Sequence, residues 1–138
     1  MTYSSDIDVR FGDEDHAGIV YYPRFFDFFH RAFEDFFKDH GVPYKDVLDV
    51  DNCGWPSVHA EADFASPARF GDVLSIELTV ERVGSKSVTF LFRGINRKED
   101  RLVLTGKVTC VCVFMDNFAS RPIPDKYRAM FEQHLVAE

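Results

Sequence analysis

The most regular hydrophobic pattern in the chain lies between Pro23 and Gly41. Apolar residues recur there at intervals of three and four, the period of one helix face, and the opposite positions are charged. Proline is favoured in the first turn of a helix and glycine just past its last turn. We therefore expect one long helix that begins at Pro23 and ends at His40 and Gly41. Its apolar face consists of Phe25, Phe28, Phe29, Ala32, Phe33, Phe36 and Phe37.

Elsewhere apolar residues alternate with polar ones, which is the period of a β-strand. The clearest case is the stretch 72–83, where Leu74, Ile76 and Leu78 share one face and the residues between them are polar. The same reasoning predicts strands at residues 6–11, 55–64, 86–96 and 102–115, and short helices at 43–48 and 125–134.

The order of these segments predicts the fold class. A strand, a long helix and then four successive strands are typical of an α+β fold with helices on one face of an antiparallel sheet. Seven of the 15 Phe residues fall between Phe25 and Phe37. A single sheet that curls around this helix would bury most of them, and part of one edge would remain to line a pocket. Without a repeat or a linker, we expect one domain over residues 1–138.

Composition and charge exclude several classes of protein. With 16 Lys and Arg against 23 Asp and Glu, the net charge of −7 argues against nucleic-acid binding. No run approaches the roughly 18 apolar residues of a membrane span, and the N-terminus lacks the pattern of a secretory signal. Cys53, Cys110 and Cys112 show no CxxC spacing, which disfavours a zinc site and a disulfide framework. We therefore expect reduced, buried cysteines in a cytoplasmic protein that does not bind a membrane.

One loop combines acidic residues, glycine and aromatic residues directly before the long helix. A helix N-terminus carries unpaired amides and partial positive charge, which suit a developing oxyanion. A carboxylate beside it would act as nucleophile or general base on a carbonyl polarised there. Consecutive side chains cannot all point at one ion, so we expect no metal site. The candidates for the carboxylate chemistry are Asp13, Glu14, Asp15 and His16.

The run FGDEDHAGIVYYP in this loop resembles the motif of hotdog-fold acyl-CoA thioesterases, in the 4-hydroxybenzoyl-CoA thioesterase branch. A second stretch, DFASPARFGDVLSIEL, resembles the strand-turn-strand signature of that family, and the resemblance covers nearly the entire chain. It implies a hotdog fold, in which a curved antiparallel sheet wraps a long central helix, and the hydrolysis of a coenzyme A thioester.

The resemblance also implies roles for single residues. Asp15 falls on the catalytic carboxylate of the family, which attacks the thioester carbonyl or activates a water. Tyr22 falls where this branch offers a backbone N–H to the thioester oxygen, and Gly18 would let the loop approach the substrate closely. The sequence departs from the family at Glu14, where relatives usually carry Thr or Cys, so a second charge stands beside Asp15.

Three further residues are implied around the acyl group. His30 stands where the branch carries an acid that meets the substrate phenol, and both a pocket role and a structural role remain open for it. His59 and Asp63 lie four positions apart on one face of a strand. They would either support the substrate site or lie at a seam between subunits.

The phosphates of coenzyme A require basic residues on an exposed rim. The resemblance places nucleotide contacts at the turn between two strands, and Arg93 and Arg97 are alternatives elsewhere on the sheet. The residues at that turn are Arg82, Ser85 and Lys86.

Together these patterns predict a thioesterase for an aromatic, hydroxybenzoyl-like acyl-CoA. Coenzyme A is part of the substrate, so no separate cofactor is expected. Hotdog domains pair through their sheets, which implies a homo-oligomer, at least a dimer and preferably a tetramer. A thioesterase for short-chain or fatty acyl groups and a non-catalytic subunit that binds acyl-CoA are the alternatives. A hydratase is disfavoured because those enzymes use a His and acid pair that this motif lacks.

Overall fold

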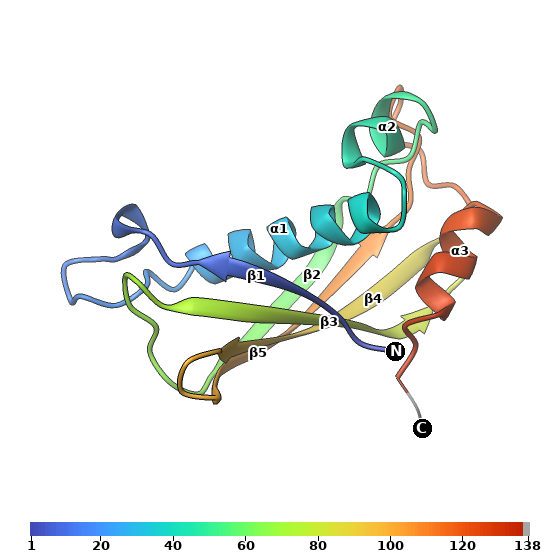
Figure 1. Ribbon diagram of the computed structural model, residues 1–138. Coiled ribbons are helices and arrows are strands. Elements are labelled where there is room, and N and C mark those ends of the chain that lie inside the picture. Colours follow the sequence, from blue (N-terminus) through green and yellow to red (C-terminus); the bar gives the residue numbers. More distant parts are fainter. Residues whose placement is uncertain (137–138) are drawn as a thin grey trace.

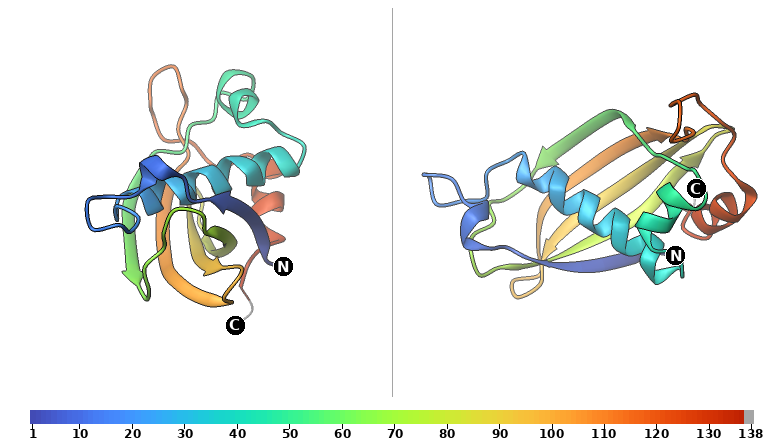
Figure 2. Two further views of the ribbon diagram at one scale, coloured as in Figure 1. Left: turned by 60° about the vertical axis from the view of Figure 1, so that its left-hand side comes forward. Right: turned by 90° about the horizontal axis from the view of Figure 1, so that it is seen from above.

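A curved antiparallel sheet wraps around one long helix in this computed structural model, which describes residues 1–136 (Figure 1). The helix α1 (Arg24–Asp39) lies along the concave face of the sheet, and the left-hand view of Figure 2 shows the strands curling around it. The sheet has five strands in the order β1-β3-β4-β5-β2, so that β1 and β2 form its two edges. The strands are β1 (Tyr3–Asp8), β2 (Ser57–Phe64), β3 (Val73–Val83), β4 (Ser87–Asn96) and β5 (Arg101–Val111).

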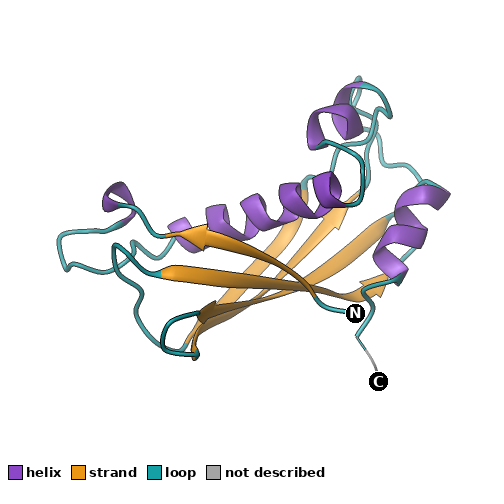
Figure 3. Cartoon of the chain, viewed as in Figure 1, coloured by secondary structure: helices purple, strands orange, loops and turns teal. Residues whose placement is uncertain are grey.

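The prediction for the long helix is confirmed at every position of its apolar face. All seven residues of that face are buried, and Gly41 adopts a left-handed conformation with φ of 90° just past the helix end. The predicted α+β class is likewise confirmed. Two short helices follow in the chain, α2 (Tyr44–Asp49) and α3 (Asp125–Glu132), and α3 lies near the first residue of the chain (Figure 3).

A close approach between α1 and the sheet depends on a glycine in β5. A Cβ added at Gly106 would lie 2.3 Å from the ring of Phe29, which itself stacks on Phe92 with ring centroids 4.6 Å apart. The absence of a side chain at this position therefore lets the aromatic face of α1 lie directly on the sheet. The helix-facing positions of β3 at residues 74, 76, 78 and 80 are fully buried beside it.

The predicted first strand, residues 6–11, was placed too late in the sequence. The strand β1 spans Tyr3–Asp8, and residues 11–13 form a single turn of 3-10 helix. The Tyr3 hydroxyl donates to Asp39 over 2.6 Å and the Ser5 hydroxyl donates to Asp35 over 2.5 Å. These polar residues contact the helix through hydrogen bonds. A pattern of alternating apolar residues does not indicate such contacts, so the start of the strand was missed.

The predicted last strand, residues 102–115, extended too far. The strand β5 ends at Val111, because Val113 pairs instead with Gly54 and Ser120. The terminal helix ends at Glu132 rather than at His134. Within residues 1–136, no helix is both long enough and apolar enough to cross a membrane.

Candidate active site

Three consecutive acidic residues in the loop before α1 have three different environments. Asp13 is buried, and its carboxylate accepts the Arg10 amide hydrogen over 2.8 Å. The carboxylate of Glu14 accepts the amide hydrogen of Phe70, 3.1 Å away in the loop between β2 and β3. Asp13 therefore stabilises the turn, and Glu14 ties the loop to its neighbour.

The third acid, Asp15, lies exposed at the tip of the loop, which projects at the left of Figure 1. Its amide donates to the Ile19 carbonyl over 2.9 Å, and its own carbonyl accepts the Gly18 amide over 3.0 Å. Gly18 has φ of 79°, which favours glycine at this position. One carboxylate oxygen, Oδ1, accepts the Ala17 amide over 2.8 Å. Oδ2 has no hydrogen-bond donor among residues 1–136, so it is free to react.

Directly before α1, one backbone amide is available as a hydrogen-bond donor to a substrate. The amides of residues 24, 25 and 26 donate to the carbonyls three positions earlier over 2.8, 3.2 and 3.1 Å. Pro23 has no amide hydrogen, and the Tyr22 amide has no acceptor among residues 1–136. The positive end of the helix dipole lies at the same place. The Tyr22 N–H is therefore placed to donate to an oxygen atom that carries developing negative charge.

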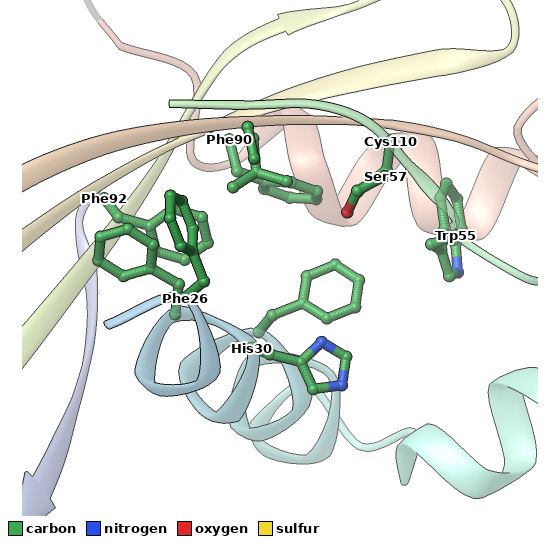
Figure 4. Close-up of a pocket in the computed structure, with 11 residues that line it drawn as sticks. Phe26, His30, Trp55, Ser57, Phe90, Phe92 and Cys110 are labelled. Carbon is green, nitrogen blue, oxygen red and sulfur yellow. The ribbon is translucent and has the colours of Figure 1, made fainter. Parts of the chain in front are cut away.

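A cavity of about 150 Å³ opens between α1 and the sheet, beginning one helical turn beyond Tyr22 (Figure 4). The helix supplies one wall, and β4, β5 and the start of β2 supply the others. An apolar cavity of about this volume holds a single benzene ring. The lining residues are Phe26, Phe29, His30, Phe33, Trp55, Ser57, Ala60, Phe90, Phe92, Val108 and Cys110.

His30 lies at the helix side of this cavity with its ring half exposed. Its Nε2 is 2.9 Å from the Glu34 carboxylate, and its ring stacks on Phe33 with centroids 5.7 Å apart. The ring edge of Tyr44 completes the contact at 6.0 Å. The structure thus brings His30 to the pocket while also engaging it with Glu34.

Two polar atoms lie together at the sheet side of the cavity. The Ser57 hydroxyl oxygen is 3.8 Å from the Cys110 sulfur. Burial raises the pKa of the Cys110 thiol to about 11, so this side chain stays protonated at neutral pH and is a poor nucleophile. The pair therefore contributes hydrogen-bonding groups and no charge to a wall that is otherwise apolar.

The structure does not bring His59 and Asp63 to the cavity. Of the β2 residues, Ser57 and Ala60 line the cavity, and Ala60 is paired with Val108 of β5. His59 and Asp63 alternate with it and project from the opposite, outer face of the sheet. There the His59 ring contacts the Glu61 carboxylate at 3.1 Å.

The predicted contacts for coenzyme A lie at the other end of the sheet from Asp15. Arg82, Ser85 and Lys86 are exposed at the turn between β3 and β4, whereas the loop that carries Asp15 adjoins the beginning of β3. The 11 residues of β3 separate the two by about 33 Å. The alternative contacts for coenzyme A, Arg93 and Arg97, form ion pairs on the outer face of the sheet. Arg93 lies 2.9 Å from Glu77, and Arg97 lies 2.6 Å from Asp6.

Several pocket residues were not predicted from the sequence. Trp55, Ser57 and Cys110 come from segments far from the loop motif and meet only through the pairing of β2 with β5. A signal was present in the small side chains of Ser57, Ala60 and Ala62, because they leave space opposite a helix face rich in Phe. Among residues 1–136, no three His, Cys, Asp or Glu side chains are grouped so as to hold a metal ion.

Comparison with known sequences places this arrangement among related proteins. A sequence model of the thioesterase-like superfamily matches residues 9–131. A 1,4-dihydroxy-2-naphthoyl-CoA hydrolase from Acaryochloris marina is 30% identical over 118 residues. That match covers 84% of this chain and 85% of the relative.

Solved structures show the same course of the backbone. A thioesterase superfamily member from Jannaschia sp. CCS1 is 31% identical, with a TM-score of 0.92 over 99% of this chain and 94% of the other. A gentisyl-coenzyme A thioesterase is 29% identical, with a TM-score of 0.84 over 94% of this chain and 99% of the other. The similarity therefore extends over nearly the whole described chain.

Proposed function

This chain belongs to the thioesterase-like superfamily, and on that premise we propose that it hydrolyses an aromatic, hydroxybenzoyl-like acyl-CoA at the loop before α1. The resemblance to hotdog-fold acyl-CoA thioesterases in the sequence is confirmed by the family match and by the fold. The enzyme class, an acyl-CoA thioesterase, is confirmed with it. What we propose beyond this is the acyl group and the residues that act on it.

The observation that carries the proposal is the aromatic cavity next to a free helix amide. With a rise of 1.5 Å per residue, the axial distance from Tyr22 to Phe26 is about 6 Å. A thioester oxygen held by the Tyr22 amide would thus place the acyl group at the mouth of the cavity. The cavity volume of about 150 Å³ suits one ring. The named substrates of two relatives, a dihydroxynaphthoyl-CoA and a gentisyl-CoA, are aromatic as well.

In the proposed reaction, the Tyr22 amide stabilises the negative charge that develops on the thioester oxygen. Asp15 either attacks the carbonyl carbon, giving an anhydride that water opens, or takes a proton from an attacking water. Both routes break the carbon–sulfur bond, release coenzyme A as a thiol and leave the acyl group as a carboxylate. Neither route requires a cofactor apart from the coenzyme A of the substrate.

We further propose that the working enzyme is a homo-oligomer built on the edge strand β2. Its residues are almost all exposed, including Val58 and Phe64. In β2, Phe64 lies at the end of the sheet next to Tyr22, and Ser57 lies at the end near the β3–β4 turn. Antiparallel pairing of β2 with a second copy would therefore bring the Arg82–Lys86 turn of that copy toward Asp15. Such a dimer would complete a site that one chain leaves open.

The cellular location belongs to the same proposal. Cys53, Cys110 and Cys112 are all buried and free of disulfide bonds. Reduced thiols of this kind are typical of the cytoplasm, and we therefore place the enzyme there.

A substrate panel tests the proposed acyl group. Thiol release is measured with hydroxybenzoyl-CoA, benzoyl-CoA, phenylacetyl-CoA, a short-chain acyl-CoA and a long-chain acyl-CoA. We expect the highest kcat/KM for the benzoyl compounds. A preference for the short or long aliphatic chains would contradict the aromatic assignment. Binding of all these compounds in calorimetry without hydrolysis would instead indicate a non-catalytic subunit.

A further inference from the structure

The polar atoms of the residues that line the cavity between α1 and the sheet differ in how many hydrogen-bond partners they already have. His30 contacts the Glu34 carboxylate at 2.9 Å. The Trp55 indole nitrogen is buried under protein atoms and has no partner among residues 1–136. Ser57 differs from both, because it is exposed and its hydroxyl has one weak partner, the Cys110 sulfur at 3.8 Å. Ser57 is therefore the cavity residue whose polar group is both accessible and only weakly engaged.

The direction of the Ser57 side chain makes this polar group usable. Figure 4 shows its oxygen pointing from the sheet toward α1, between Phe90 and Trp55. The neighbouring wall residues are mostly aromatic, so a polar substituent placed there would find few protein partners other than Ser57. A hydroxyl group both donates and accepts, and it suits a ring hydroxyl equally well in either role.

We propose that Ser57 is a specificity-determining residue that hydrogen-bonds a hydroxyl substituent on a single aromatic ring of the acyl group. This inference rests on the proposed function, because it assumes that an aroyl group enters the cavity. It adds the prediction that the enzyme discriminates between substituted and unsubstituted rings of the same size. Removing the Ser57 hydroxyl would leave the substituent unpaired in an apolar wall, which lowers its reaction rate selectively.

The test compares kcat/KM for 2-, 3- and 4-hydroxybenzoyl-CoA with that for benzoyl-CoA. We consider the hydroxylated isomer that the wild type prefers. Ser57→Ala should lower the ratio of kcat/KM for this isomer to kcat/KM for benzoyl-CoA, called its advantage, by about three- to tenfold. Ser57→Thr keeps a hydroxyl and should retain the advantage even if both rates fall. Ser75→Ala, on the outer face of β3, is the matched control and should change neither rate.

The outcomes separate this inference from the proposed function. If the wild type hydrolyses aroyl-CoA compounds but Ser57→Ala keeps the wild-type advantage, Ser57 has no role in selectivity and the inference is wrong. If the wild type hydrolyses no aroyl-CoA, the proposed function itself fails and this inference fails with it.

A second, independent observation concerns two histidines at the far end of α1. The Nε2 atoms of His40 and His134 are 2.9 Å apart. The Nδ1 of His40 is 2.6 Å from the Phe36 carbonyl, and the Nδ1 of His134 is 2.9 Å from the Met1 carbonyl. The pair therefore joins the end of α1 to the first residue of the chain and to the segment after α3.

Counting hydrogens gives the charge that these contacts would require. A carbonyl oxygen only accepts, so both Nδ1 atoms must carry a hydrogen. The contact between the two Nε2 atoms requires one more hydrogen, because two lone pairs at that distance would repel. Three hydrogens on the four ring nitrogens of two imidazoles give the pair one positive charge. His40 caps the C-terminal end of α1, where the helix dipole favours a cation, and His134 is only 2% exposed.

We propose that His40 and His134 share one proton and clamp Met1 and the segment after α3 to the end of α1 in a pH-dependent way. The groups that face the pair are Tyr3, whose hydroxyl donates to Asp39 at 2.6 Å, and the amino group of Met1. Lys126 and Tyr127 of α3 line the adjoining hollow. Burial, followed by the charge of His40, lowers the pKa of His134, so a second proton is resisted in the folded state.

Nitrogen NMR of the imidazole rings tests the clamp directly. At neutral pH, one of the two rings should show both nitrogens protonated, and the other should show only Nδ1 protonated. Two neutral rings would overturn the proposal. The free energy of unfolding should also fall as the pH drops below about 6.5, because the unfolded chain then binds more protons than the folded one. His134→Gln should flatten this dependence, and an unchanged slope in that variant would contradict the clamp.

Discussion

At the scale of single residues, burial and hydrogen bonding distinguish three neighbouring acids of the loop. Asp13, Glu14 and Asp15 are adjacent and chemically alike, and each accepts one backbone amide, but Asp13 is buried, Glu14 binds another loop and Asp15 is exposed. The sequence alone left the four candidates of this loop equal until the family resemblance singled out Asp15. The exposure of Asp15 beside the buried Asp13 and the tethered Glu14 supports the same choice on physical grounds.

This difference predicts unequal effects of two neighbouring substitutions on the free energy of unfolding. Asp13→Ala removes a buried acceptor from the Arg10 amide and should lower the free energy of unfolding by about 1–2 kcal/mol. Asp15→Ala alters an exposed side chain and should change it by less than about 0.5 kcal/mol. Urea unfolding of both variants measures the two values, and equal losses would argue against a structural role for Asp13.

At the scale of elements, the packing of α1 on the sheet was the most predictable part of the molecule. Its helical period and its end signals lie within one segment, so the sequence alone defined the whole buried face. The strand β1 was misplaced because Tyr3 and Ser5 meet α1 through hydrogen bonds. The pocket contact between Ser57 and Cys110 spans 53 positions of sequence and arises from strand pairing, which no local pattern encodes.

The approach of α1 to β5 gives a prediction at this scale. Gly106→Ala places a methyl group against the Phe29 ring and should destabilise the fold by about 1–3 kcal/mol. Gly12→Ala is the matched control, because a Cβ there meets no atom within 4 Å. Thermal or urea unfolding compares the two variants. The account of the helix contact would be wrong if both were equally stable.

At the scale of the whole molecule, the two halves of the proposed site lie at opposite ends of one chain. Asp15 and the Tyr22 amide are at one end of the sheet, and the basic turn of Arg82, Ser85 and Lys86 is at the other. In the proposed homo-oligomer, one acyl-CoA would contact Asp15 of one copy and the basic turn of another. The exposed edge strand β2 is the element through which we expect that copy to bind.

A charge on this edge should separate the copies. Val58 is 63% exposed in the isolated chain, so Val58→Asp should leave each chain folded. In the proposed dimer the new carboxylate would approach the seam and weaken the pairing. Sedimentation at micromolar concentration should show an oligomer for the wild type and a monomer for the variant, with a higher KM in the monomer. A wild type that is already monomeric would contradict the shared site.

The most direct test of the central claim is the rate of hydroxybenzoyl-CoA hydrolysis by Asp15→Asn beside the wild type. The variant keeps the shape of the side chain and an oxygen for the Ala17 amide, but it loses the carboxylate that attacks or takes a proton. We predict a loss in kcat of about a thousandfold or more, with unfolding unchanged. A variant that retains the wild-type rate would show that Asp15 does not catalyse the reaction.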